Sequence, residues 1–177
     1  MTGLPGAGKS TLAMAVERQL FECGYYAYVL DGDNLRGGLN KDLGFSAEDR
    51  TENIRRAGEV AALFADAGII VIAAFISPFR RDRETARHAA PGAFHEIYLS
   101  ADLQTCEARD PKGMYRRARE GKILDFTGVS APYEAPLQPE LTIDTARNSV
   151  EDSVRQLFDY IVSATNGKPR EVLSRAL

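Results

Sequence analysis

The chain has 177 residues, 44% of them hydrophobic and 27% charged, which is typical of a globular domain with room for one sizeable core. Its 22 basic and 25 acidic residues give a net charge of −3, which argues against a general nucleic-acid-binding protein. Two cysteines are too few for a disulfide framework and favour a cytoplasmic setting. The longest apolar run, residues 68–76, is about half of the roughly 20 residues that a membrane helix needs, so we expect no membrane partner.

Apolar residues recur at helix-like and strand-like spacings in alternating segments of the chain. We expect helices over residues 9–23, 46–67, 77–89 and from 149 onward, with shorter helical pieces over 103–121. We expect strands over residues 26–30, 68–76, 95–101 and 141–143. This alternation predicts an α/β fold, in which a parallel sheet is covered by helices on both faces. Ligands of such sheets bind beyond the carboxyl ends of the strands.

A glycine-rich stretch, GLPGAGKS at residues 3–10, matches the phosphate-binding pattern G-x-x-x-x-G-K-[ST]. The glycines allow several backbone N–H groups to point at one anion, and the helix that follows adds its positive end. We expect Lys9 to be a solvent-facing, mobile charge that reaches the β- and γ-phosphates, and Ser10 to offer a hydroxyl to Mg²⁺. The pattern therefore predicts a site for a nucleoside triphosphate with Mg²⁺, in preference to a plain turn before a helix.

An acidic stretch, DGDNLR at residues 31–36, follows the first expected strand. It places Asp31, Asp33 and Arg36 at the mouth of the sheet, where a carboxylate can orient an acceptor hydroxyl, take its proton or hold a metal-bound water. A solvated turn explains the stretch about equally well, because Asp, Gly and Asn favour turns. On the next helix, Arg50 and Asn53 share a face. Phe45, just before that helix, fits either the core or a platform for a base, and its position favours the core.

Two later stretches carry further candidate groups. Ser77, after the apolar strand, can be a nucleophile, a helix cap or a binding hydroxyl, and we favour cap or contact because neither histidine is near it in the sequence. The run over residues 106–128 is rich in arginine and lysine and is punctuated by glycines. It fits a mobile basic lid that closes over a polyphosphate and excludes water, with a solvated helix as the alternative.

The chain contains six stretches in a specific order: GLPGAGKST, LDGDNLR, LGFSAEDRTENIRR, FISPFR, CEARDPKGMYRRAREG and DFTGVSAPYEAP. Together they resemble the adenylylsulfate kinase family, from about residue 2 to residue 162. The resemblance implies a P-loop fold that transfers a phosphoryl group from ATP, with Mg²⁺, to the 3′-hydroxyl of adenosine 5′-phosphosulfate. The implied products are ADP and 3′-phosphoadenosine 5′-phosphosulfate, the activated donor of sulfate assimilation.

The resemblance also assigns residues to roles, motif by motif. It implies that ATP is held by Gly3, Pro5, Gly6, Ala7, Gly8, Lys9, Ser10, Thr11 and Arg109, with Ser10 on the metal and Arg109 beside the base. It implies that the acceptor is held by Asp33, Asn34, Arg36, Phe45, Arg50, Asn53, Ile76, Ser77, Lys112 and Phe126. The implied catalytic residues are Lys9, Asp33 and Ser77, with Phe45 and Phe126 on either side of the acceptor adenine. The family motif treats Ser77 as a phosphoserine intermediate, whereas we favour direct in-line transfer.

The chain departs from the family pattern at two points. Pro5 stands where the family usually has serine, which removes one backbone N–H from the loop. Only Met1 and Thr2 precede the loop, which an apolar central strand normally feeds. A sheet without that strand has two unpaired edges inside its core. We therefore hypothesise that the chain is cut from a longer protein and that a fused sulfate-activating domain supplies the strand.

Two other functions stay open beside the adenylylsulfate kinase reading. One is another small-molecule P-loop kinase of the gluconate or shikimate type, which DGDNLR and DFTG disfavour. The other is an inactive ATP-binding regulatory domain. We assign residues 1–165 to the kinase domain and residues 166–177 to a polar tail of no assigned function. Relatives suggest a homodimer, and sulfate adenylyltransferase is the expected fused or associated partner.

Overall fold

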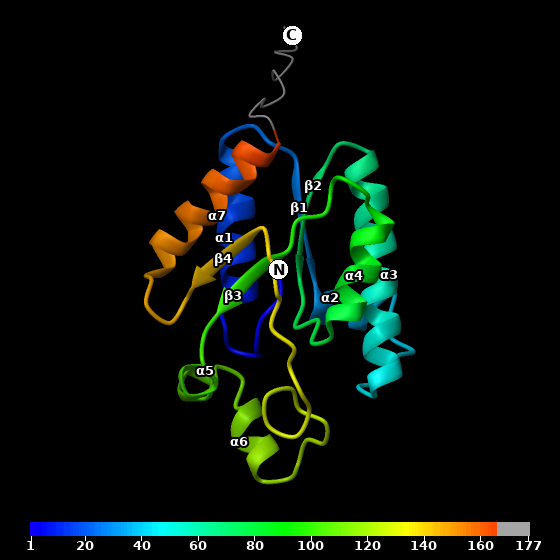
Figure 1. Cartoon of the computed structure of the whole chain (residues 1–177), viewed down its shortest axis with the longest axis vertical. Helices are drawn as coiled ribbons and strands as arrows, with labels where there is room; N and C mark the ends of the chain where they lie inside the picture. The colour runs from blue at the N-terminus through cyan, green and yellow to red at the C-terminus, as the bar shows by residue number, and fades with distance from the viewer. Residues whose placement is uncertain (166–177) are drawn as a thin grey trace, which may run out of the picture.

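A computed structural model describes residues 1–165, and Figure 1 shows helices on both sides of the strands. The strands are β1 (Ala27–Asp31), β2 (Ile70–Ala74), β3 (Ile97–Ser100) and β4 (Leu141–Asp144). The helices are α1 (Lys9–Glu22), α2 (Gly32–Gly37), α3 (Ala47–Asp66), α4 (Arg80–Ala89), α5 (Leu103–Arg109), α6 (Met114–Arg119) and α7 (Val150–Ala164). The α/β alternation is confirmed, and the predicted polar tail lies outside the described residues.

The sheet consists of two parallel pairs of strands, with the first two residues of the chain between them. β1 pairs with β2, and β3 pairs with β4. Thr2 donates its N–H to Ile97 and accepts from Leu99 N–H, both at 2.9 Å. On the other side, the Met1 carbonyl accepts from Phe75 N–H at 3.3 Å. Within residues 1–165, β2 and β3 therefore belong to separate two-stranded sheets, which Met1 and Thr2 connect.

Two layers of helices bury the apolar faces of the strands. α1 and α7 pack together on one face, and α3 and α4 pack together on the other (Figure 1). The larger core lies under α1 and α7 and contains the fully buried Leu99, Ile143 and Leu157. A smaller core under α3 includes Ile54 and Phe75. Burying each such side chain contributes about 1.5–3 kcal/mol, so the α1–α7 side dominates stability. Within residues 1–165, every helix is too short or too polar to cross a membrane.

Side-chain caps determine where several helices begin. Ser46 Oγ accepts from Asp49 N–H at 3.1 Å and starts α3. Ser149 caps α7 in the same way, at 3.0 Å. Each cap satisfies a backbone donor that the first turn leaves free, which contributes about 1 kcal/mol.

The segment before α4 differs from the prediction. α4 begins at Arg80 and not at Ser77, and its N-cap residue is Phe79 without a side-chain cap. Pro78 accounts for the exclusion of Ser77 from the helix, because proline disfavours helical geometry in the residue before it. Ser77 instead has φ 39°, in the left-handed region that residues other than glycine rarely occupy. The prediction that Ser77 caps the helix is therefore wrong.

The acidic stretch after β1 is a short helix, and the solvated-turn alternative is wrong. It forms α2, whose N-cap is Asp31. The Asp31 carboxylate accepts from Asp33 N–H at 2.9 Å, and Asp33 places a negative charge in the first turn. Both features stabilise a helix start at the end of the strand.

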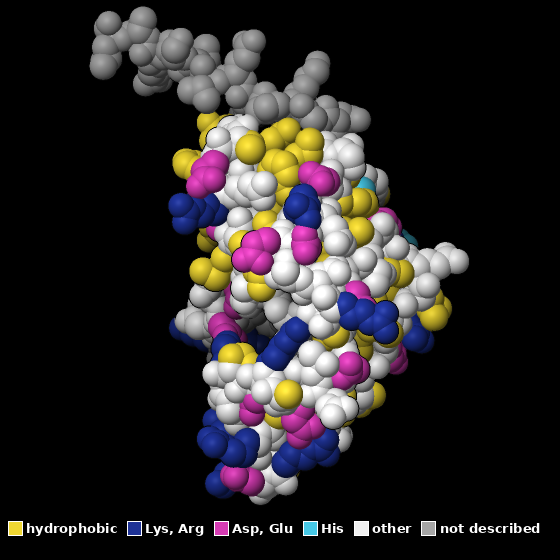
Figure 2. Space-filling view, turned by 90° about the vertical axis from the view of Figure 1, so that its left-hand side faces the viewer, with side chains coloured by type: hydrophobic (Ala, Val, Ile, Leu, Met, Phe, Trp, Pro, Cys, Tyr) yellow, Lys and Arg dark blue, Asp and Glu magenta, His cyan; other side chains and the backbone are white. Residues whose placement is uncertain are grey.

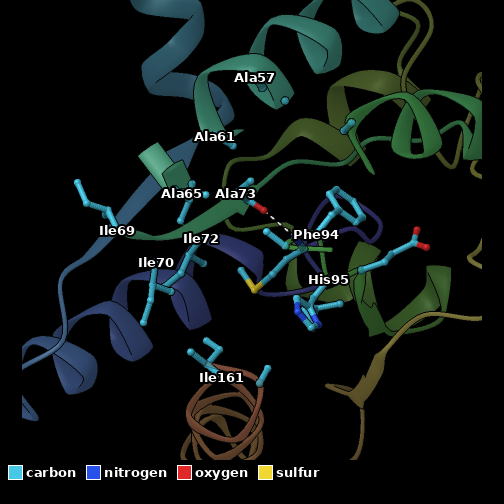
Figure 3. Close-up of a pocket in the computed structure, with 18 of the residues that line it drawn as sticks. Ala57, Ala61, Ala65, Ile69, Ile70, Ile72, Ala73, Phe94, His95 and Ile161 are labelled. Atoms are coloured by element: carbon cyan, nitrogen blue, oxygen red, sulfur yellow. Dashed lines mark hydrogen bonds between the residues drawn. The ribbon is translucent and has the colours of Figure 1, made fainter. Parts of the chain in front are cut away.

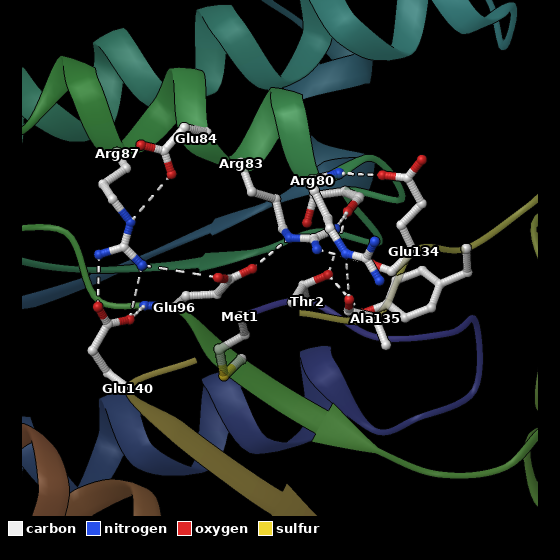
Figure 4. Close-up of polar contacts among 12 residues, drawn as sticks. Met1, Thr2, Arg80, Arg83, Glu84, Arg87, Glu96, Glu134, Ala135 and Glu140 are labelled. Carbon is white, nitrogen blue, oxygen red and sulfur yellow. Dashed lines mark hydrogen bonds and ion pairs between the residues drawn. The ribbon is translucent and has the colours of Figure 1, made fainter. Parts of the chain in front are cut away.

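Ion pairs connect α4 to the residues directly before β3 and β4 (Figure 4). Arg83 is only 5% exposed and pairs with Glu96. Arg87 pairs with Glu140 at 2.6 Å and lies 3.8 Å from Glu96. Arg83 also donates to the Ser77 carbonyl at 2.7 Å. These contacts join the two halves of the sheet where strand pairing does not.

Candidate active site

The phosphate loop lies at the carboxyl ends of the central strands, as predicted. Gly6 and Gly8 have φ of 80° and 94°, which favour glycine. A Cβ at Gly6 would lie 2.9 Å from the Cys106 carbonyl oxygen, so a larger residue does not fit there. α1 begins at Lys9, so the positive end of a 14-residue helix lies at the loop. The structure brings together the predicted ATP residues of this loop, Gly3, Pro5, Gly6, Ala7, Gly8, Lys9, Ser10 and Thr11.

Lys9 folds back into the loop. Its Nζ donates to the carbonyl oxygens of Gly3 at 2.9 Å and Leu4 at 2.8 Å. The expectation that Lys9 faces solvent is therefore wrong, because these two carbonyls hold the ammonium inside. Burial lowers the pKa of Lys9 to about 8. A phosphate in the loop would supply the negative charge that restores the preference for the protonated form.

Ser10 lies directly beside a carboxylate. Its Oγ donates to Asp31 Oδ2 at 2.7 Å. A hydroxyl and a carboxylate are both oxygen ligands of the kind that Mg²⁺ uses together with substrate phosphates. Within residues 1–165, no group of three or more His, Cys, Asp or Glu side chains is arranged so that it could hold a metal ion. The pair therefore fits a metal shared with a nucleotide. The sequence placed Asp31 at the end of a strand as a candidate carboxylate, and the structure adds its contact with Ser10.

The predicted catalytic carboxylate and the predicted lid lysine meet in the structure. Lys112 Nζ forms an ion pair with Asp33 Oδ2, and their side chains are 67% and 75% exposed. The hydrogen bond to Asp33 raises the pKa of Lys112. An ion pair this exposed contributes about 0–1 kcal/mol to stability, so it can be exchanged for other partners at little cost. Asn34 lies next to Asp33 on α2 and is exposed.

A cavity of about 370 Å³ lies between the start of α3 and residues 125–132. Phe45 lines it and is 61% exposed, so the prediction that Phe45 is a core residue is wrong. Guanidinium groups surround its ring, with Arg36 4.5 Å and Arg50 5.8 Å from the ring centre. The result is a cationic site with an aromatic surface, which suits an anionic ligand that carries a flat ring.

The two arginines are fixed by backbone carbonyls. Arg36 donates to the Gly44 carbonyl at 2.7 Å. Arg50 donates to the Asp125 carbonyl at 2.7 Å and to Thr127 Oγ1 at 3.3 Å. Partial burial lowers the pKa of both arginines, which stay charged because guanidinium groups are very basic. Each guanidinium has five N–H donors, so donors are left for a ligand.

Phe126 lies apart from the exposed ring of Phe45. It is 6% exposed and packs edge-to-face on Tyr115, with ring centres 5.0 Å apart. It is not among the residues around the cavity that Phe45 lines. The sandwich of Phe45 and Phe126 around an adenine stays a prediction.

Three other predicted acceptor residues are engaged with the protein itself. Asn53 is buried, and its Oδ1 accepts from Asn40 Nδ2 at 3.0 Å. The Ile76 carbonyl accepts from Thr2 Oγ1 at 2.8 Å. Ser77 is 7% exposed, and within residues 1–165 no hydrogen bond links its hydroxyl to a base. Their contacts with an acceptor stay predictions.

Arg109 contacts the phosphate loop from α5. It donates to the Gly6 carbonyl at 3.5 Å and to the Thr145 carbonyl. Thr145 Oγ1 in turn donates to the Ala7 carbonyl at 3.0 Å. Sequence reasoning missed Thr145, although it directly follows β4 at the carboxyl edge of the sheet.

The basic segment around α6 is hydrogen-bonded to the phosphate loop. Tyr115 is 1% exposed and donates its hydroxyl to the Pro5 carbonyl at 2.8 Å. The Asp110 carboxylate accepts from Tyr115 N–H at 3.0 Å, and Arg119 pairs with Glu107 at 2.9 Å. Figure 2 shows the lysine and arginine side chains of this end interspersed with acidic ones. Closure of the segment as a lid stays a prediction.

A glycine-rich loop between a central parallel strand and a helix, with a lysine and a serine at the helix start, defines the P-loop class of phosphate-binding proteins. The family model of adenylylsulphate kinase matches residues 1–144. The chain therefore belongs to the adenylylsulfate kinase family.

Individual relatives agree with this assignment. The chain is 57% identical to a probable adenylyl-sulfate kinase of Halalkalibacterium halodurans, over 94% of this chain and 83% of that protein. It is 60% identical to an adenylyl-sulfate kinase of Geotalea uraniireducens, over 90% of this chain and 77% of that protein. Among solved structures, the Mycobacterium tuberculosis APS kinase CysC in complex with AMPPNP and APS matches with a TM-score of 0.87 and 48% identity. That match covers 90% of this chain and 94% of the other.

Proposed function

We propose that the chain transfers the γ-phosphoryl group of ATP to the 3′-hydroxyl of adenosine 5′-phosphosulfate, which yields ADP and 3′-phosphoadenosine 5′-phosphosulfate. One observation carries the proposal: besides its phosphate loop, the chain has an exposed aromatic ring that two arginines flank. Such a surface suits a second, anionic nucleotide better than it suits a sugar. The relative solved with AMPPNP and APS bound supports the same pairing of ligands.

ATP would lie with its phosphates in the loop and its base toward Arg109. Lys9 would exchange the Gly3 and Leu4 carbonyls for the β- and γ-phosphates, which neutralises charge at the transferred group. Ser10 and Asp31 would hold Mg²⁺, which would supply positive charge to neutralise the phosphates.

The acceptor would occupy the cavity lined by Phe45 and Arg50. Its anionic phosphosulfate group would be compensated by arginine, and Asp33 would orient the 3′-hydroxyl or accept its proton. Lys112 contacts Asp33, and releasing that exposed ion pair would free both groups for substrate. Transfer would then be direct, because phosphoryl transfer relies on positioning and charge neutralisation more than on covalent help. Ser77, without a base on its hydroxyl in the described chain, would serve as a contact.

Assembly and setting belong to the same proposal. We expect a homodimer in the cytoplasm, with sulfate adenylyltransferase fused or associated as the supplier of the substrate. Light scattering of the purified protein gives the oligomeric state, and a monomer at the concentration used for the assay would overturn the dimer without affecting the chemistry.

Incubation with Mg²⁺, ATP and each candidate acceptor in turn tests the reaction. Chromatography and mass spectrometry should find the 3′-phosphorylated nucleotide with adenosine 5′-phosphosulfate and no product with gluconate or shikimate. Phosphorylation of either small acceptor at a higher rate would favour the alternative small-molecule kinase. Tight ATP binding without any product would favour the regulatory alternative.

A further inference from the structure

The segment after β2 borders two hollows of different character. A cleft of about 590 Å³ with mainly apolar walls lies between β2 and β3, where Figure 3 shows Ala61 of α3 and Ile161 of α7. The smaller cavity, of about 370 Å³, has Phe45 and Arg50 in its wall. Because apolar surroundings disfavour a charged ligand, the smaller cavity is the one that suits an anionic acceptor.

Two stretches that are far apart in the sequence contribute walls to this smaller cavity. Pro78 and Phe79 come from the turn between β2 and α4. Ser130, Ala131 and Pro132 come from the segment between α6 and β4. The shape of the cavity therefore depends on how these two stretches are held against each other.

The turn between β2 and α4 has a conformation that needs support. Ser77 has φ 39°, and a residue other than glycine stays in this left-handed region only where its surroundings hold it. Arg83 is 5% exposed and donates to the Ser77 carbonyl at 2.7 Å. α4 then begins at Arg80, and its N-cap residue, Phe79, has no side-chain cap. The turn therefore relies on groups from other parts of the chain.

The second stretch, residues 126–131, is closed on itself by hydrogen bonds. The Phe126 carbonyl accepts from the N–H groups of Val129, Ser130 and Ala131, each at 3.0 Å. The Ala131 carbonyl accepts from Gly128 N–H at 2.8 Å. Such a turn behaves as one unit, so its position depends on the contacts at its two ends.

Each end of this unit is attached to a different helix. At the first end, Arg50 of α3 donates to the Asp125 carbonyl at 2.7 Å and to Thr127 Oγ1 at 3.3 Å. At the second end, the attachment is Glu134, which contacts the start of α4.

Glu134 makes its contacts through three separate groups (Figure 4). Its N–H donates to the Pro78 carbonyl at 2.8 Å. Its carboxylate accepts from Arg80 N–H at 2.8 Å, which satisfies a free donor of the first turn and places a negative charge at the positive end of α4. Its carbonyl accepts from Arg83 Nη2 at 2.8 Å. Arg83 therefore joins the two stretches directly, because its other terminal nitrogen holds Ser77.

We propose that Glu134 is a positioning residue for the acceptor. Its carboxylate holds the unit over residues 126–131 against the turn after β2, and so sets the shape of the cavity that Phe45 and Arg50 line. Arg83 supports the same junction from the buried side. Glu134 is not among the residues around the cavity, so it acts through the wall and not by touching a substrate. The identity of the acceptor rests on the proposed function.

The kinetics of Glu134→Ala test this role. Loss of the carboxylate should loosen the wall, so the KM for adenosine 5′-phosphosulfate should rise about 5–20-fold, while the KM for ATP stays within about twofold of the wild type. Glu134→Gln keeps an acceptor oxygen for Arg80 N–H. This variant should therefore bring the KM for adenosine 5′-phosphosulfate back to within about threefold of the wild type.

Glu140→Ala is the matched control. The Glu140 carboxylate also joins α4 to a neighbouring segment, because it pairs with Arg87 and accepts from Glu96 N–H, both at 2.6 Å. It lies outside the wall of the acceptor cavity. Both alanine variants should lower the thermal unfolding midpoint by about 2–6 °C, and Glu140→Ala should leave both KM values unchanged. An equal rise in the KM for adenosine 5′-phosphosulfate in both variants would show general loosening and overturn the positioning role.

Amide hydrogen exchange gives a readout that does not depend on the reaction. Exchange at Val129, Ser130 and Ala131 should be at least about tenfold faster in Glu134→Ala and unchanged in Glu140→Ala. Unchanged exchange in Glu134→Ala, or an unchanged KM in an active protein, would overturn the positioning role. If the wild type does not phosphorylate adenosine 5′-phosphosulfate, the proposed function fails. Exchange alone then decides whether Glu134 holds this wall.

Discussion

The two ends of the central position in the sheet differ sharply. At the carboxyl end, the phosphate loop is held by side chains from distant segments, with Tyr115 on Pro5 and Thr145 on Ala7. At the amino end, β2 and β3 face each other across an apolar cleft of about 590 Å³. The comparison teaches that contacts to the phosphate loop serve the chemistry, whereas core side chains beside the cleft, such as Leu157, serve the stability of the fold.

Lys9→Ala should produce the largest effect. It should lower activity strongly and stability only slightly, because Lys9 lies in the phosphate loop at the carboxyl end of the sheet. We expect kcat to fall at least about 1,000-fold, since the variant lacks a charge on the transferred phosphoryl group. Stability should change by only about 1–2 kcal/mol, the order of two lost hydrogen bonds to partly buried carbonyls. Steady-state kinetics and urea unfolding measure both, with Lys41→Ala as the exposed control. A rate loss below about tenfold would contradict the role of Lys9.

Leu157→Ala, at the amino end of the sheet, should lower stability while leaving activity nearly unchanged. Leu157 is 1% exposed and borders the cleft from α7. We expect a loss of about 2–4 kcal/mol in unfolding free energy, as for other large-to-small core changes. At a temperature where the variant is folded, kcat should stay within about twofold of the wild type. A large fall in kcat would show that the two ends of the sheet are coupled and would contradict the separation of chemistry from stability.

Arg50→Lys should weaken the acceptor site alone. Lysine cannot bond Asp125 and Thr127 while it also flanks Phe45. We expect the KM for adenosine 5′-phosphosulfate to rise about 10–100-fold, or about 1–3 kcal/mol, with the KM for ATP unchanged. The control is Arg55→Lys on the same helix, where Arg55 pairs with Glu52 at the surface. Equal changes in both KM values would place Arg50 outside the acceptor site.

ATP affinity should depend on pH through Lys9. Because burial lowers the pKa of Lys9 to about 8, the free protein loses this proton above pH 8. ATP binding then requires proton uptake, so Kd should rise by up to about tenfold per pH unit above 8. Calorimetry in buffers of different ionisation enthalpy measures the uptake. The Lys9→Arg variant keeps its charge and should show a flat profile; the same slope in that variant would assign the proton elsewhere.

Ser77→Ala should have the smallest effect. Direct transfer predicts that kcat stays within about threefold of the wild type, since no phosphate passes through the hydroxyl. Radiolabelled ATP followed by gel analysis tests for phosphoprotein in the wild type. Labelled Ser77 in the wild type, together with loss of activity in the variant, would contradict direct transfer.

The parts of the molecule that follow from local pattern could be predicted from the sequence. The helix over residues 9–23 and the loop before it depend on glycines, on apolar spacing and on the register of Lys9 and Ser10, and the structure contains both.

The remaining features depend on contacts that no local pattern encodes. The position of Lys9 inside the loop depends on two carbonyls that only the folded loop brings near it. Tyr115 reaches Pro5 across 110 positions of sequence. The surroundings of the exposed Phe45 ring depend on Arg36 and Arg50, which the fold brings beside it.

The most direct measurement is a crystal structure with a non-hydrolysable ATP analogue and adenosine 5′-phosphosulfate bound together. The account predicts the analogue's phosphates in the loop and the second nucleotide in the cavity lined by Phe45 and Arg50, with its 3′-hydroxyl within hydrogen-bond distance of Asp33. The second nucleotide bound elsewhere, or bound with its 3′-hydroxyl directed away from the γ-phosphate, would contradict the account.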